Sequence, residues 1–141
     1  MAPLPAIWLA TAIAAFGLAG ETNASDASPG SLTGKPGDST RGRAIVLDRR
    51  VGNCLICHKA PVEGEPFQGD LGPDLTGVAA RLSEGQIRYR LVDQSRLNPA
   101  TLMPPYHRTD DLARVAERFQ GRPVLTVHEI EDVVAWLATL K

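Results

Sequence analysis

The most regular pattern of apolar and polar residues lies at the end of the chain. Apolar residues recur there at intervals of three and four, which is the spacing of one helix face: Ile130, Val133, Val134, Leu137 and Leu140. Directly before them, Thr126 and Glu129 stand three residues apart, as the two members of a capping box do. The pattern predicts a helix that begins at Thr126 and buries one face.

Two earlier segments also have helical patterns. One runs from residue 39 or 40 to about residue 50, where apolar residues alternate with arginines before a Gly-Asn pair. The other begins at Ser83, whose capping box with Gln86 precedes Ile87 and Leu91 on one face. Both segments are therefore predicted to be helices with one buried face.

A weaker helical pattern covers residues 112–119, with Gly121 as its stop, and predicts a further helix. Prolines exclude regular structure in other places. Residues 60–73 hold three Pro and three Gly, so this segment is predicted to be a loop. The pairs Asn98-Pro99 and Pro104-Pro105 exclude a regular helix around them. No segment has the strict alternation of a strand. The sequence therefore predicts an all-α fold.

The first residues have the layout of a secretory signal peptide. An apolar run over residues 4–19 is followed by a polar stretch of small residues. We expect a signal peptide over residues 1–27, cleaved somewhere between 19 and 27, with a short uncleaved anchor as the alternative. A flexible lead-in over 28–38 and a folded domain over 39–141 follow. The mature chain would then be periplasmic and would have no membrane span.

Charge and cysteine content narrow the function classes. The chain holds 15 basic and 16 acidic residues, so it lacks the basic balance of a nucleic-acid-binding protein. It has only two cysteines, and both lie in one five-residue motif. A disulfide framework is therefore excluded.

That motif is Cys54-Leu55-Ile56-Cys57-His58, the C-x-x-C-H pattern of haem c attachment. Two thiols separated by two residues reach two neighbouring vinyl groups of one porphyrin, and the next residue then lies under the iron. We expect one covalent haem c on Cys54 and Cys57, with His58 as an axial ligand.

Two other interpretations of the motif agree less well with the rest of the sequence. A C-x-x-C pair also serves as a redox disulfide, but no βαβ pattern surrounds this one. A structural zinc site needs four ligands, usually in two paired clusters, and the chain has no second cysteine pair.

The sixth ligand is predicted to be Met103, the only methionine after the leader. A thioether opposite histidine raises the potential of the iron and suits electron transfer. The two prolines that follow would stiffen its loop. His107, His128 and Lys59 are the rivals, and His107 is the most serious because it is close to Met103.

Pro73 is the candidate for support of the proximal histidine. A ligating imidazole needs an acceptor for its other ring nitrogen, and the Pro73 carbonyl in Gly72-Pro73-Asp74-Leu75 would provide one. An ordinary Gly-Pro turn is the alternative.

Together these residues resemble a class I c-type cytochrome, and more specifically SoxX, the small monohaem subunit of the SoxAX cytochrome. The resemblance covers residues 31–141 and is carried by five stretches: Arg41–Val46, Gly52–Cys54, Gly69–Leu75, Asn98–Pro104 and Gly121–Leu137.

The resemblance implies a redox role in thiosulfate oxidation. In that family the subunit forms a heterodimer with SoxA, and the pair joins thiosulfate to a cysteine of the SoxYZ carrier. The haem-bearing chain would be a non-catalytic subunit of this enzyme and would pass electrons to a small c-type cytochrome. His58 and Met103 carry over as axial ligands.

Two other roles remain as hypotheses. A freely diffusing respiratory cytochrome often docks through a ring of lysines, but this chain has few: Lys35, Lys59 and Lys141. Arginine, the better residue for a lasting interface, is more abundant. The second role is a catalytic haem with an open position. It would require that the sixth site be empty, whereas Met103 is predicted to occupy that site.

Overall fold

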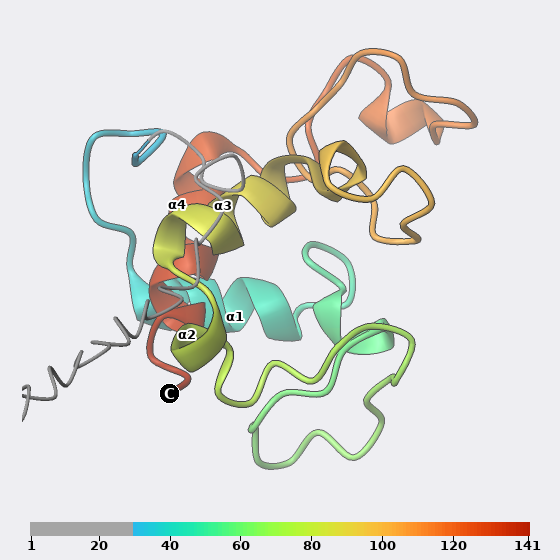
Figure 1. Cartoon of the computed structure of the whole chain (residues 1–141). Helices are drawn as coiled ribbons and strands as arrows, with labels where there is room; N and C mark the ends of the chain where they lie inside the picture. The colour runs from blue at the N-terminus through green and yellow to red at the C-terminus, as the bar shows by residue number, and fades with distance from the viewer. Residues whose placement is uncertain (1–29) are drawn as a thin grey trace, which may run out of the picture.

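The structure, a computed structural model, describes residues 30–141. The predicted signal peptide lies outside the described residues. Within them the chain forms helices and loops and no strand, which confirms the all-α prediction (Figure 1). The elements are α1 (Ser39–Leu47), η2 (Cys54–Ile56), α2 (Val78–Arg81), α3 (Glu84–Asp93), η3 (Gln94–Arg96), η4 (Glu117–Phe119) and α4 (Val127–Leu137).

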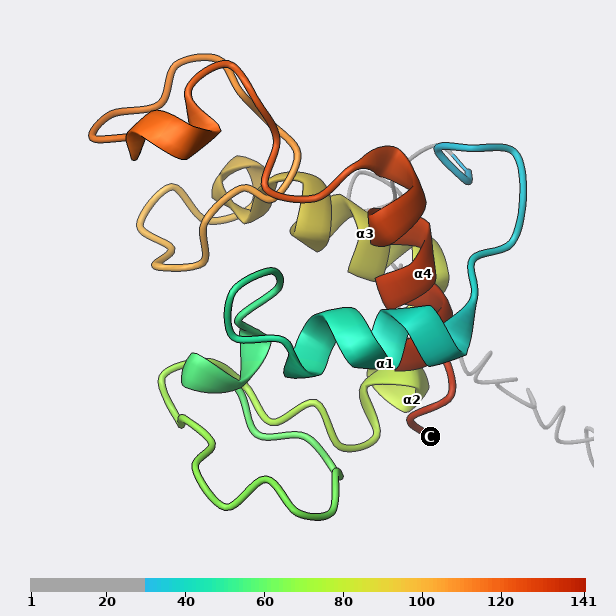
Figure 2. The same cartoon turned by 180° about the vertical axis from the view of Figure 1, so that it is seen from behind.

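The first and last helices form the centre of the fold. Figure 2 shows α1 lying across α4, and α3 also packs on α4. The crossing is close because Gly42 has no side chain: a Cβ there would collide with the carbonyl oxygen of Asp132. Ile130 and Val133 of α4 are completely buried in the core.

Capping chemistry sets where two of the helices begin. At α3, the Ser83 side chain accepts from the backbone of Gln86, whose side chain returns to Ser83. At α4, Thr126 and Glu129 make the same reciprocal pair. Both predicted capping boxes are confirmed. α1 begins instead after Asp38, whose carboxylate accepts from two backbone N–H groups of the first turn.

The predicted helix over residues 112–119 was wrong. Only the short turn η4 forms there, since Asp111 and Arg114 adopt positive φ values of 51° and 57°. A helix needs negative φ at every position, so a regular helix cannot include these two residues, whatever the spacing of the apolar side chains. Residues 108–124 instead form a loop that projects away from the helices (Figure 1).

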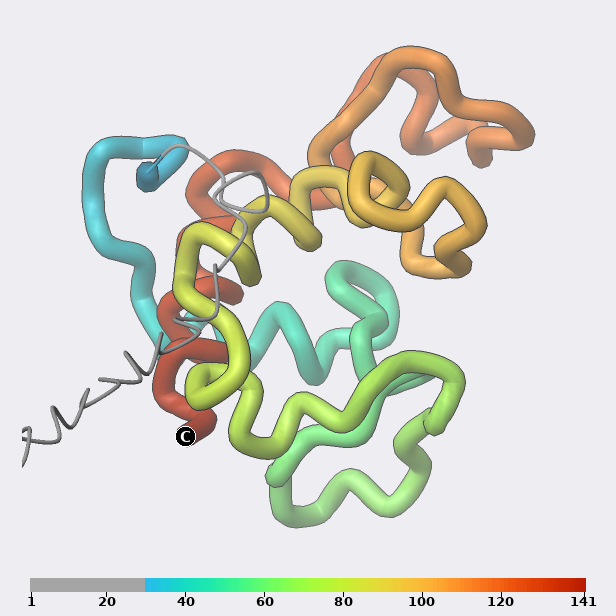
Figure 3. Tube along the Cα trace, in the orientation of Figure 1, coloured from blue at the N-terminus to red at the C-terminus, as the bar shows by residue number. Residues whose placement is uncertain are grey.

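The residues before α1 lie along α4. The backbone N–H of Leu32 donates to Glu131 Oε1 at 2.7 Å, and that of Asp38 donates to Asp132 Oδ1 at 2.6 Å. Figure 3 shows this segment leading into α1 at the start of the coloured trace. Two buried carboxylates of α4 therefore hold the entry to the domain.

Among the described residues, no helix has both the length and the apolar character needed to cross a membrane.

Candidate haem-attachment site

The Cys54–His58 motif forms one tight turn. Asn53 enters it in the left-handed conformation, with a φ of 50°. The carbonyl oxygen of Cys54 then accepts from the backbone N–H of both Cys57 (3.2 Å) and His58 (3.0 Å). The two thiols and the imidazole are thus carried by a single turn, with Leu55 buried beneath it as an anchor in the core.

The imidazole of His58 is fixed from two sides. Its Nδ1 lies 2.7 Å from the carbonyl oxygen of Pro73. Gly72 packs against the ring so closely that a Cβ would stand 2.8 Å from Nε2, and its own N–H donates to Cys57 at 2.7 Å. With Nδ1 bonded to the carbonyl, Nε2 is the ring nitrogen left for a metal.

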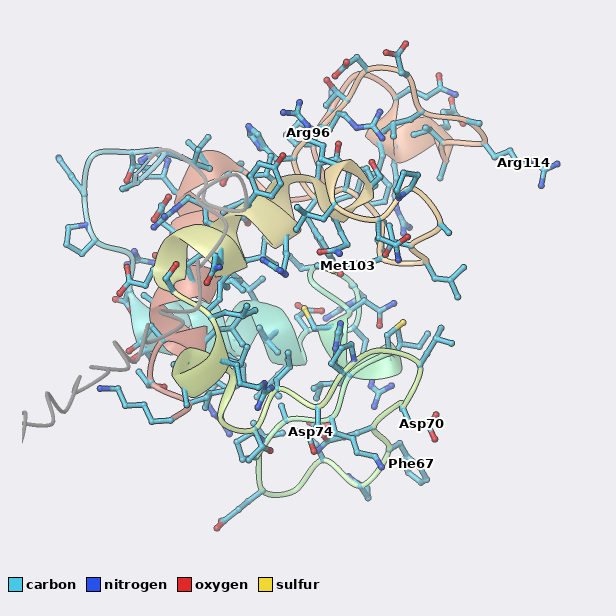
Figure 4. All side chains as sticks on the ribbon, viewed as in Figure 1. Phe67, Asp70, Asp74, Arg96, Met103 and Arg114 are labelled. Atoms are coloured by element: carbon cyan, nitrogen blue, oxygen red, sulfur yellow. The ribbon has the colours of Figure 1, made fainter. Side chains whose placement is uncertain are left out.

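Met103 lies on a loop that faces the attachment turn. Figure 4 shows Met103 on the inner side of this loop, whereas Phe67 and Asp70 lie at the outer edge of the opposite segment. The Met103 side chain is half-buried against the core, and its N–H donates to Thr101 Oγ1 at 3.1 Å. The thioether is therefore presented by an ordered turn.

Tyr106 ties the two sides together. Its hydroxyl donates to the carbonyl oxygen of Gly52 at 2.8 Å, and its backbone N–H donates to Leu91 of α3. Sequence reasoning noted Tyr106 only as an aromatic residue. The sequence signal that could have indicated this role is its position: Tyr106 follows two prolines and lies three residues after Met103.

The rival ligands are engaged or exposed. His107 Nδ1 lies 3.0 Å from the carbonyl oxygen of Leu125, which orients its ring toward the entry of α4. His128 is exposed in the first turn of α4, and Lys59 is exposed beside His58.

The Cys54 thiol lacks the character of a redox-active cysteine. Cys54 and Cys57 are both free. Burial raises the pKa of the Cys54 thiol to about 11. Redox-active cysteines have a lowered pKa, because the thiolate is the reactive form.

The donor set fits a covalently attached haem. Two neighbouring thiols, an imidazole with one nitrogen free and a thioether from a second segment are the groups that such a cofactor needs. By contrast, no group of three or more His, Cys, Asp or Glu residues suited to a bare metal ion occurs within residues 30–141.

Comparison with known proteins agrees with this chemistry. The cytochrome c family matches the chain over residues 39–141. No curated protein sequence matches significantly. A solved structure, that of SoxXA from P. pantotrophus, matches with 34% sequence identity and a TM-score of 0.76. The match covers 82% of this chain and 90% of the other. The chain thus belongs to the cytochrome c family, whose cofactor is covalent haem c, and within that family it is a cytochrome of the SoxX type.

Proposed function

We propose that this chain is the electron-transfer subunit of a periplasmic SoxAX-type L-cysteine S-thiosulfotransferase. The observation that carries the proposal is the 34% identity to SoxXA over most of both chains. The reaction joins a sulfur of thiosulfate to the cysteine sulfur of a carrier protein. One S–S bond forms, the thiol proton is released and two electrons leave.

One haem c would be held through thioether bonds to Cys54 and Cys57, and His58 and Met103 would bind its iron. The haem would supply one-electron exchange. The protein's own part is to fix the ligands: the Pro73 carbonyl sets which nitrogen of His58 is free, and the Met103 loop presents the sulfur. A His–Met pair favours electron transfer over ligand binding.

Chemistry on sulfur would take place on a partner. Both cysteines of the chain belong to the attachment motif, so no thiol is left as a nucleophile. The proposed partners are a SoxA-like haem subunit in a heterodimer, a SoxYZ-like carrier that bears the cysteine, and a small c-type cytochrome as acceptor.

The exposed apolar side chains support a lasting partner near the attachment turn. Ile56 belongs to that turn and is 59% exposed, while Phe67 is 80% and Leu71 65% exposed. The last two flank Gly69, whose N–H donates to the carbonyl of Leu55 at 2.8 Å. Large exposed apolar side chains often belong to protein interfaces. We propose that these three contact the SoxA-like subunit.

A tagged pull-down from thiosulfate-grown cells tests the proposal. The eluate is separated and stained for covalent haem. We expect a second, larger haem band near one-to-one, and a weaker one for Phe67→Ser. Leu32→Ser is the control, because Leu32 is also exposed but lies beside α4. A single small haem band at low salt would instead indicate a freely diffusing carrier.

A further inference from the structure

We propose that the ion pair between Asp93 and Arg108 closes the base of the loop that carries Met103, and so determines how readily the sulfur leaves the iron. The inference rests on the proposed function, since it takes Met103 as the sixth ligand. It assigns a positioning role to two residues that lie outside the attachment motif.

Asp93 is the buried half of the pair. It is the last residue of α3, and only 2% of it is exposed. One carboxylate oxygen accepts from the N–H of Ser95 at 3.1 Å and from its hydroxyl at 2.5 Å. The other accepts from Arg108 Nε at 2.8 Å. Arg96 approaches the same oxygen at 3.4 Å but is 60% exposed, so it contributes less.

Arg108 holds the other end of the loop that carries Met103. Its side chain is 19% exposed, and Nη1 also donates to the carbonyl oxygen of Asp110 at 2.6 Å. The neighbouring His107 N–H donates to Val92 at 3.3 Å. The chain therefore leaves α3 at Asp93, presents Met103 and returns to the same residue through Arg108.

This geometry couples the ion pair to the ligand. For the Met103 sulfur to move away, its loop must swing out from the turn that it faces. The loop is stiffened by prolines, so we place such a motion at its base, where the end of α3 meets residues 106–108 and the Asp93–Arg108 pair is the side-chain contact. Breaking the pair would leave the buried Asp93 carboxylate with only the exposed Arg96 as a cation, which disfavours opening.

The test uses the haem-loaded protein in its ferric form. Imidazole competes with Met103 for the iron, so its affinity reports how easily the loop opens, and the sulfur-to-iron charge-transfer band reports the ligand directly. We expect Arg108→Gln to raise imidazole affinity at least about tenfold, because the loop would open without separating a buried ion pair. Arg108→Lys, which keeps the charge, should give a smaller increase.

Arg41→Gln is the matched control. Arg41 donates from Nε to Asp132 at 2.8 Å, so this change also removes the cation of a buried carboxylate, but at the α1–α4 crossing. An imidazole affinity that rises equally in both variants would overturn the inference, as the effect would be general loosening. Should Arg108→Gln fail to fold, Arg108→Lys against Arg41→Lys decides by the same comparison.

Met103→Ala separates this inference from the proposal beneath it. Loss of the charge-transfer band in Met103→Ala would support ligation by Met103, whatever Arg108 does. A band that persists in Met103→Ala would refute that ligation, and the role of Asp93 and Arg108 would fall with it.

Discussion

The hydroxyl of Tyr106 donates a 2.8 Å hydrogen bond to the carbonyl oxygen of Gly52, within the protein interior. Gly52 lies two residues before Cys54, and Tyr106 lies three residues after Met103. The bond thus joins the two segments that supply the proposed haem attachment and the proposed sixth ligand. Burial raises the pKa of Tyr106 well above its ordinary value of 10.0, so the donor proton is retained in alkaline solution.

Tyr106→Phe removes this donor and leaves the Gly52 carbonyl buried without a partner. We expect the free energy of unfolding to fall by about 1–2 kcal/mol, measured by guanidinium unfolding of the haem-loaded protein. Tyr89→Phe makes the same chemical change at a half-buried position on α3. Equal losses in the two variants would show that the bond to Gly52 adds nothing to the free energy of unfolding beyond the general effect of removing a tyrosine hydroxyl.

Gly72→Ala tests the packing against His58. The added methyl would stand 2.7 Å from Nδ1, closer than any relaxed contact, so the imidazole must turn away from the Pro73 carbonyl. We expect a changed midpoint potential and a free energy of unfolding lower by about 1–3 kcal/mol, the usual cost of overpacking.

Asp70→Ala is the control for that change, because Asp70 is exposed in the same segment. A potential unchanged by Gly72→Ala would mean that the ring orientation does not depend on this contact.

Gly42→Ala tests the crossing of α1 and α4. A Cβ at this position meets the Asp132 carbonyl, which belongs to the backbone and cannot swing aside. We expect a loss of about 3 kcal/mol or more in the free energy of unfolding, at the upper end of overpacking costs. Ala44→Ser, on an exposed position of α1, should have little effect. A stable Gly42→Ala protein would show that the helices can separate freely.

Stability should fall in acid through the carboxylates of α4. The hydrogen bond from Arg41 holds the pKa of Asp132 below its ordinary 3.8, against the effect of burial. A depressed folded-state pKa stabilises the protein above the unfolded-state pKa, and this contribution is lost as pH falls through the folded value. Unfolding measured from neutral pH down past 3.8 should show the decline.

Asp132→Asn checks that assignment. The variant should be less stable than the parent protein at neutral pH and should lose less stability in acid. A decline of the same size in both proteins would place the titrating group elsewhere, with Glu131 next to be tested.

The sequence predicted best what depends on neighbouring residues. The capping boxes at Ser83 and Thr126 involve positions three residues apart, and both are present in the structure. The contact between His58 Nδ1 and the Pro73 carbonyl joins residues 15 apart and is also present in the structure. Its prediction rested on the need of a ligating imidazole for an acceptor rather than on spacing. The ligand roles of His58 and Met103 stay predictions.

One local prediction failed. The apolar spacing at residues 112–119 indicated a helix, but the backbone conformation of Asp111 and Arg114 excludes it.

Contacts between segments that the fold brings together were not predictable. Asp93 and Arg108 read as ordinary surface charges in the sequence, because nothing local shows that the loop between them returns to its start. Helix α2 was missed since four residues carry too little periodicity.

The pairing of α1 with α4 has a consequence for how the domain assembles. Arg41 and Asp132, which meet at this crossing, are 91 residues apart in the chain. Contacts of such long separation form late, because the intervening chain must first lose its conformational freedom. A nascent chain that stops before Val127 therefore has α1 but lacks α4, so the central crossing of the fold cannot form until the last helix has been made.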